Sequence, residues 1–132
     1  MAEFTKTKLV KGTVLFKEGD KGDEAYLIIT GQIQLRKDVL SEYPQMVATL
    51  GSGDVVGEMA LFDNRPRLAE AMISEDAEVF VIPRDEFSDR IAGMNPVMRR
   101  ILQIMVARVR KMTDEFMQRK QRAKWGDDWK RK

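Results

Sequence analysis

The sequence of 132 residues contains neither cysteine nor histidine. Without cysteine, the chain forms no disulfide and performs no thiolate chemistry. Without histidine, it lacks the most common general base and the most common transition-metal ligand in proteins. We therefore expect a protein that is not an enzyme, with no catalytic residues, no bound metal and no cofactor.

The sequence also lacks a hydrophobic run of the length that a membrane-spanning helix requires. Its first residues, Met1 to Lys6, do not contain the apolar core of a secretory signal. With 43% hydrophobic and 33% charged residues, the composition is ordinary for a soluble globular protein. We expect one cytoplasmic domain with an appended helix or tail.

The charged residues are unevenly distributed. Residues 1–107 contain 13 Lys or Arg and 17 Asp or Glu, a net charge of −4, whereas residues 108–132 contain 10 and 4, a net charge of +6. The basic tail, which includes Trp125 and Trp129, could bind nucleic acid, an anionic lipid surface or an acidic protein. Alternatively, it binds no partner. We favour a solvated, frayed terminus and expect neither nucleic acid nor membrane binding.

Short stretches of β-forming residues alternate with turn residues in the first two thirds of the chain. Turns are predicted at Gly31 and at residues 74–76. Strands are predicted at residues 8–12, 13–17, 25–30, 32–36, 46–50, 69–73 and 77–82. Many short antiparallel strands at this spacing indicate a sandwich, a jelly roll or a small barrel.

The periodicity becomes helical after residue 82. Pro83, which is followed by acidic residues, begins a helix that is predicted to end near Gly93. Asn95 and Pro96 form a second start signal, a capping residue followed by proline. The helix that follows contains no internal glycine or proline and is predicted to end at about Lys120.

This long helix carries apolar residues at heptad spacing. Steps of 4, 3, 4, 3 and 4 residues separate Met98, Leu102, Met105, Val109, Met112 and Phe116. A second stripe beside them contains Val97, Ile101, Ile104 and Arg108. The stripes form either one broad core-facing surface or two surfaces, one of which faces a partner. We favour the second and expect a symmetric homodimer, because a small barrel cannot cover the helix beyond Val109.

A turn that begins with glycine and leads to an arginine occupies the middle of the chain, in residues 57–69. Gly57 allows close backbone approach, and N–H groups at the start of a helical turn favour an anion. Arg67 can donate two hydrogen bonds to phosphate oxygens, and Glu58 can accept one from a sugar hydroxyl. A ribose phosphate complements these groups. On spacing alone, a structural salt bridge between Glu58 and Arg67 fits equally well.

These residues resemble a known family. The segments Gly57-Glu58-Met59-Ala60-Leu61 and Pro66-Arg67-Leu68-Ala69 are similar to the phosphate-binding cassette of cyclic nucleotide-binding domains. The family includes regulatory subunits of cAMP-dependent protein kinase, the bacterial catabolite activator and cyclic nucleotide-gated channels. The resemblance covers roughly residues 9–112, and further matching positions are Glu18, Gly19, Asp20, Gly22, Tyr26, Gly31, residues 50–54, Phe87, Asn95 and Pro96.

The resemblance implies a mainly β fold with some α structure. An eight-stranded antiparallel β-roll, also called a jelly roll or double-stranded β-helix, would be joined by a short cassette helix and two C-terminal helices. Residues 1–112 would form the nucleotide-binding roll with its lid helix, and residues 113–132 a helix extension and basic tail. The implied function is a sensor or regulatory domain that binds cAMP or cGMP and signals to a downstream protein by moving its last helix.

The resemblance also implies roles for individual residues. Arg67 would hold the cyclic phosphate, Glu58 the ribose 2′-hydroxyl, and the backbone N–H groups of Ala60 and Leu68 would complete the phosphate cradle. Arg108 would cap the base, with Val109 or Met105 as alternatives. Val47, Val56 and Leu61 would form the apolar walls of the pocket for the ribose and the base. The full set expected to bind the ligand is Gly57, Glu58, Met59, Ala60, Arg67, Leu68, Ala69, Val47, Val56, Leu61 and Arg108.

Two residues depart from the family pattern. Leu68 stands where serine or threonine often helps to recognise guanine, so cAMP is expected to be preferred over cGMP. Glu70 stands where threonine or serine is common, and its carboxylate either pairs with Arg65 or competes for Arg67. In the second case nucleotide binding weakens. The alternative function is then a β-roll that binds no nucleotide and acts as a protein-interaction module.

Overall fold

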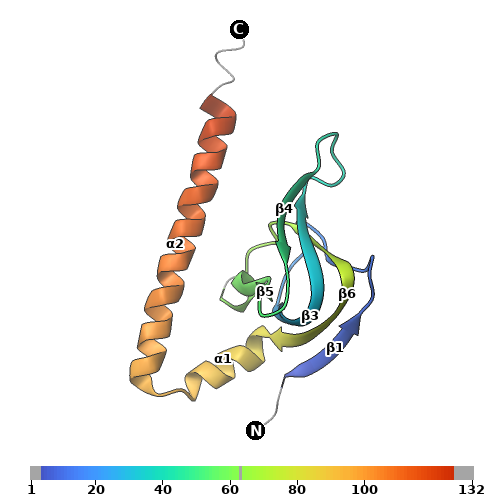
Figure 1. Ribbon diagram of the computed structural model, residues 1–132. Coiled ribbons are helices and arrows are strands. Elements are labelled where there is room, and N and C mark those ends of the chain that lie inside the picture. The colour runs from blue at the N-terminus through green and yellow to red at the C-terminus, as the bar shows by residue number, and fades with distance from the viewer. Residues whose placement is uncertain (1–3, 63, 127–132) are drawn as a thin grey trace. The chain divides into compact units, whose positions relative to one another are not determined.

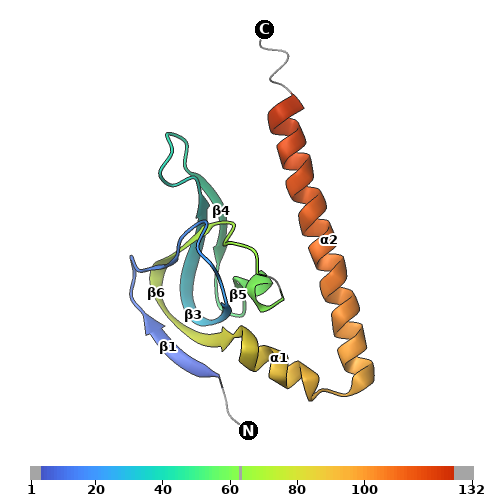
Figure 2. The same ribbon diagram turned by 180° about the vertical axis from the view of Figure 1, so that it is seen from behind.

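The computed structural model describes residues 4–62 and 64–126, and the surroundings of side chains as far as residue 112. Contacts divide the chain into two compact units, Met1–Arg90 and Ile91–Lys132. The first unit contains a curved β-sheet, and the second contains a long helix (Figure 1, Figure 2). The side chains of Phe116 and Trp125, and most of the basic tail, lie outside the described part of the structure. Trp129 lies outside it entirely. The predictions for these residues therefore stay predictions.

One sheet holds the six strands of the described residues. Its centre is an antiparallel pair of long strands, β3 (Glu24–Lys37) and β6 (Glu70–Pro83). The shorter strands are β1 (Thr5–Leu9), β2 (Val14–Phe16), β4 (Gln45–Leu50) and β5 (Val55–Val56). β1 and β2 pair with β6, and β4 and β5 pair with β3, all in antiparallel orientation. The predicted mainly β, antiparallel fold class is confirmed.

The two long strands bend without breaking, which explains why this sheet has six described strands and not eight. The predictions of turns at Gly31 and at residues 74–76 are wrong, because both segments continue as strand. The β3–β6 register shifts at several steps between Ile28 and Ile33, where bulges bend the two strands together. Gly31 has a φ of +94°, and a Cβ atom there would lie 2.3 Å from the carbonyl oxygen of Asp76.

The core of the first unit lies on one face of this sheet. Tyr26, Ile28 and Ile33 reach it from β3, and Ile73 and Val79 reach it from β6. All five residues are buried, because successive side chains of a strand point to opposite faces and the apolar residues recur on one of them. Ile33 belongs to the predicted strand at residues 32–36, Tyr26 and Ile28 to that at 25–30, Ile73 to that at 69–73 and Val79 to that at 77–82.

Two short elements surround the cassette in the first unit. The 3-10 helix η1 (Glu58–Leu61) lies between β5 and β6 and is the short cassette helix expected from the sequence. The helix α1 (Arg84–Ala92) follows β6 directly and confirms the helix predicted to begin at Pro83, although Pro83 itself is the last residue of β6. The ring of Phe87 on α1 packs edge-to-face against Phe62 just after η1, with 5.4 Å between ring centroids. The cassette and the start of α1 are therefore in contact.

The second unit contains the long helix α2 (Pro96–Gly126), which extends beyond its predicted end. Its predicted cap is confirmed, since Oδ1 of Asn95 accepts the N–H groups of Val97 at 2.9 Å and Met98 at 3.5 Å. Most of the apolar residues with described side chains are exposed: Val97, Met98, Ile101, Ile104, Met105, Val109 and Met112. None of the helices in the described ranges combines the length and hydropathy that a membrane span needs.

The bend at Gly31 generates a stability prediction. Gly31→Ala should destabilise the protein by about 2–4 kcal/mol, because it adds a collision with the backbone of β6 to the strain of a positive φ. Gly53→Ala is the matched control, since Gly53 has a φ of +88° but no atom within 4 Å of an added Cβ, and about 1 kcal/mol is expected there. Urea unfolding measures both values, and equal losses would contradict the close packing of the bend.

Candidate functional site

The cassette begins at Gly57, directly after β5. Gly57 has a φ of +74° and is the N-cap residue of η1, a conformation that residues with a Cβ atom rarely adopt. A Cβ atom at this position would lie 2.4 Å from Nη1 of Arg67. The positive φ of the turn therefore favours glycine, and the missing side chain lets Arg67 lie against it.

The side chain of Arg67 is buried, and only 9% of the residue is exposed. Its Nη2 donates a hydrogen bond to the backbone oxygen of Glu24 at 2.7 Å, and its Nη1 contacts the backbone oxygen of Gly57 at 3.4 Å. The guanidinium stacks on Phe16 in a cation–π contact, with 4.0 Å between Cζ and the ring centroid. Its Nε is buried and has no hydrogen-bond partner in the described structure.

The turn between β2 and β3 holds the backbone of Arg67. The N–H of Arg67 donates to the carbonyl oxygen of Asp20 at 2.7 Å, and the N–H of Gly19 donates to the carbonyl oxygen of Arg67 at 2.8 Å. Gly22 lies so close that a Cβ atom there would be 2.3 Å from Nε of Arg67. Two glycines, Gly22 and Gly57, therefore make the space that the guanidinium fills.

No negative charge among the described residues matches the positive charge of Arg67. Neither Glu58, which is exposed, nor any other described carboxylate forms an ion pair with Arg67, so the structural salt bridge that the spacing allows is not formed. Burying an ionised group is costly unless opposite charge or hydrogen bonds compensate it. Two carbonyl oxygens and one aromatic ring compensate only part of this charge, so the site favours an anion.

Glu70 is also buried, but its charge is matched. Its Oε2 accepts a hydrogen bond from Nη2 of Arg36 at 2.8 Å, and the two residues lie opposite one another in the β3–β6 ladder. The predictions that Glu70 pairs with Arg65 or competes for Arg67 are therefore wrong. The cross-strand register decides the partner, and the distance along the sequence does not reveal it.

The ring of Phe16 is held in turn by Tyr26. The two rings stack with 6.3 Å between their centroids, and the Tyr26 hydroxyl donates to the carboxylate of Glu24. Burial raises the pKa of Tyr26 well above its ordinary value, and the hydrogen bond to Glu24 raises it further, so the hydroxyl stays protonated. The sequence does not predict that Phe16 and Glu24 belong to the site. An aromatic residue in a β-forming stretch indicates only core packing, and Glu24 binds Arg67 through its backbone oxygen.

The other predicted ligand residues differ in exposure. Those that are buried are Val56, Ala60, Leu61 and Ala69. Met59 is half-buried, whereas Leu68 and Val47 are exposed, Val47 on the outer strand β4. The cassette residues thus gather around η1 in the first unit. Arg108 and its alternatives lie on α2 in the second unit, so a contact between them and the base remains a prediction.

A second arginine, Arg84, joins the cassette to the turn between β2 and β3. Arg84 is the first residue of α1, and its Nε donates to the carbonyl oxygen of Ala60 at 2.6 Å. Its Nη2 donates to the carbonyl oxygen of Gly22 at 2.6 Å, and its Nη1 donates to Oδ1 of Asn64. The sequence shows Arg84 only as a residue at a helix start, because the oxygens that it binds belong mostly to the backbone.

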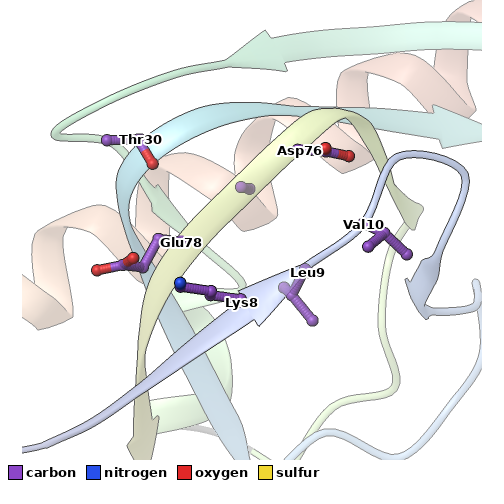
Figure 3. A pocket seen from close by; sticks show the side chains of 7 residues that line it. Lys8, Leu9, Val10, Thr30, Asp76 and Glu78 are labelled. Carbon is purple, nitrogen blue, oxygen red and sulfur yellow. The ribbon is translucent and has the colours of Figure 1, made fainter.

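Two hollows of the described surface are lined by residues outside the cassette. One, of about 290 Å³, opens beside β1 and the bends of β3 and β6 (Figure 3), and it is lined by Lys8, Leu9, Val10, Thr30, Asp76, Ala77 and Glu78. Another, of about 760 Å³, is lined by Lys17, Glu18, Asp38, Val39, Leu40, Ser41 and Glu70. Neither contains a residue predicted to bind the ligand. Within the described ranges, no three acidic side chains are grouped to hold a metal ion.

Comparison with known proteins identifies similar sequences. The model of the cyclic nucleotide-binding domain family matches residues 6–93. The cyclic AMP receptor protein of Thermus thermophilus is 28% identical over 110 residues, which are 83% of this chain and 51% of the relative. The cAMP-dependent protein kinase regulatory subunit of Aspergillus fumigatus is 35% identical over 94 residues, 70% of this chain and 22% of the relative. The chain spans about half the length of the first relative and less of the second.

Solved structures of the EAL enzyme Bd1971 are also similar to this chain. Its half-site-occupied form has a TM-score of 0.73 and 27% identity, covering 84% of this chain and 99% of that one. Its cAMP-bound form has a TM-score of 0.63 and 28% identity, and the match covers 89% of this chain and 32% of that one. A cGMP-bound form of the same enzyme has a TM-score of 0.61 and 29% identity, covering 80% and 28%.

The match to the family covers more than half of the chain, from β1 to the end of α1. The Gly57 turn, the short helix η1 and the buried Arg67 all lie within the matched residues. These are the elements that carry the resemblance in the sequence. The chain therefore belongs to the cyclic nucleotide-binding domain family.

Proposed function

We propose that this domain binds a cyclic nucleotide and acts as a sensor or regulatory domain without catalytic activity of its own. The observation that carries the proposal is the buried charge of Arg67, which no described carboxylate neutralises. A ligand phosphate would supply the missing counter-charge. The family match, a relative named as a cyclic AMP receptor and a cAMP-bound neighbour support a cyclic nucleotide as the source of that phosphate.

In the proposed complex, Arg67 binds the cyclic phosphate and Glu58 accepts a hydrogen bond from the ribose 2′-hydroxyl. Glu58 is exposed and its carboxylate is engaged by no described residue, which leaves it available for a hydroxyl. The N–H of Ala60 already donates to the carbonyl oxygen of Gly57 at 3.1 Å. This N–H would be shared between that oxygen and the phosphate, whereas the N–H of Leu68 would bind the phosphate alone.

The base is proposed to be adenine in preference to guanine. Leu68 is an exposed residue of the cassette and has no hydroxyl with which to bind a guanine edge. The fold itself does not make the choice, because Bd1971 has been solved with cAMP and with cGMP. The preference therefore depends on single side chains, of which Leu68 is the nearest to Arg67 in the chain.

The output is proposed to pass through the last helix. Arg108, or alternatively Met105 or Val109, would contact the base from α2, and the ligand would favour the helix arrangement that allows this contact. Residues 1–112 would form the functional unit, and residues 113–132 an extension of it. In this view the bent strands β3 and β6 each count as two strands of an eight-stranded jelly roll.

A symmetric dimer is proposed to form along the heptad positions of α2. The apolar side chains at four of these positions are exposed: Met98, Met105, Val109 and Met112. Leu102, between them, is half-buried. Two copies of such a helix can bury these side chains against each other by knobs-into-holes packing. The downstream protein that would receive the signal is a further partner.

The first prediction concerns Arg67. Arg67→Ala should weaken cAMP binding by roughly 2–5 kcal/mol, because it removes the one charged contact to the phosphate in a buried site. Arg65→Ala is the matched control, since Arg65 is an exposed arginine of the same loop, and it should bind cAMP like the wild type. Titration calorimetry measures the three affinities.

Two results of this titration would refute the proposal. No heat with the wild type at near-millimolar cAMP and cGMP would leave the protein-interaction module as the function. An equal affinity of the wild type and Arg67→Ala would show that the nucleotide binds elsewhere. Circular dichroism of Arg67→Ala establishes that the variant is folded before its affinity is compared.

The second prediction concerns the choice of base. Leu68→Thr introduces a hydroxyl and should shift the ratio of cGMP to cAMP affinity towards cGMP by about 2- to 12-fold, the value of one hydrogen bond. Leu68→Val is the control, because valine has the shape of threonine without the hydroxyl and should leave the ratio unchanged. Competition of each nucleotide against a fluorescent cAMP analogue measures the ratio. Equal shifts in the two variants would rule out a role for the hydroxyl.

The third prediction concerns the dimer. Met105→Lys combined with Met112→Lys should produce a monomer, because it places two charges of each chain in the apolar seam. Gln103→Lys combined with Ala107→Lys adds the same charge at exposed positions outside the heptad seam and should remain dimeric. Light scattering measures the mass of each. If the wild type is monomeric at high concentration, the proposed dimer is refuted.

A further inference from the structure

The carbonyl groups of three successive residues, where the turn after β2 enters β3, are bound by two arginines. The Gly22 carbonyl accepts Nη2 of Arg84 at 2.6 Å, and the Asp23 carbonyl accepts the backbone N–H of Arg84 at 2.8 Å. The Glu24 carbonyl accepts Nη2 of Arg67 at 2.7 Å. Arg67 of the proposed anion site and Arg84 at the start of α1 therefore bind neighbouring peptide groups of the same segment.

We propose that Arg84 is the positioning residue that couples the nucleotide site to the C-terminal helices. The inference deepens the proposed function and rests on it. When Arg67 binds a phosphate, its hydrogen bond to Glu24 competes with the new bonds. Any adjustment of this carbonyl moves the peptide groups beside it, and Arg84 is bonded to both of the preceding ones.

Arg84 also holds the other side of the site. Its Nε binds the carbonyl oxygen of Ala60 in η1, while its Nη2 binds Gly22, so one guanidinium spans the cassette helix and the turn. The planar fork of an arginine can hold two oxygens in fixed directions, whereas a lysine is a flexible point charge. The two segments that meet the nucleotide in the proposed complex are thereby joined to each other through Arg84.

From Arg84 the connection continues along the helices. Phe87, one turn further on α1, packs against Phe62 after η1. At the other end of α1, the carbonyl oxygen of Ala92 accepts Nη1 of Arg99 from the first turn of α2 at 2.9 Å. An unbroken series of contacts thus leads from Arg67 through the turn and Arg84 to α1, and from α1 to α2.

The test compares Arg84→Gln and Arg84→Lys in the full chain, with Arg90→Gln as the control. Arg90 is an arginine of the same helix, but its described contacts are with Glu86 and Phe4. Calorimetry gives the cAMP affinity, and hydrogen exchange of residues 84–112 with and without saturating cAMP gives the response of the helices. In the wild type, cAMP should change this exchange by about fivefold or more, the lower end of allosteric coupling.

Both Arg84 variants should bind cAMP within about tenfold of the wild type but lose most of the exchange response, because the site remains and its connection to α1 does not. A variant that is merely destabilised would exchange faster with and without cAMP and would keep the difference. Arg90→Gln should keep the wild-type response. If Arg84→Gln does not fold, Arg84→Lys, which retains the charge, provides the same comparison.

The outcomes separate the two proposals. If calorimetry shows that the wild type binds no cyclic nucleotide, the proposed function and this inference are both refuted. A wild type that binds cAMP without any exchange response in residues 84–112, or Arg84 variants that respond like the wild type, refute only the role of Arg84. The same loss of response in Arg90→Gln would also refute it, because the effect would then belong to α1 in general.

Discussion

The buried positive charge of Arg67, which no described carboxylate neutralises, constrains the structure around the cassette. Arg67 needs space, hydrogen-bond acceptors and an aromatic surface, and the chain supplies all three from distant segments. Gly22 and Gly57 leave the space, the carbonyl groups of Glu24 and Gly57 accept its protons, and Phe16 covers one face of the guanidinium. Because these compensations are incomplete, the arrangement is suited to an anion from outside.

The sequence predicts those parts of this arrangement that depend on local chemistry. The caps and prolines locate both helices, and the stretches of β-forming residues between turn residues locate most strands. The bends are missed, because a glycine opposite a polar triplet is as typical of a turn as of a bulge in a continuous strand. The choice between them depends on long-range pairing of β3 with β6, which no local pattern contains.

The candidate site follows the same division. Arg67 and Gly57 are found from the sequence because their chemistry is specific to their residue types. The partner of Glu70 is missed because register sets it, and Arg84 is missed because it binds mainly backbone oxygens, which every residue possesses. Side-chain identity thus predicts which groups are available to a ligand. It does not predict which groups hold them in place.

The contact between Gly22 and Arg67 has an evolutionary consequence. A side chain at position 22 would occupy the place of the guanidinium, so the two positions cannot change independently. A lineage that keeps the arginine in this position is expected to keep the glycine, although the two lie far apart in the chain. A lineage that loses the arginine releases the glycine from this constraint. We therefore expect the two positions to change together in related proteins, and the residue at position 22 would record whether selection still maintains the anion site.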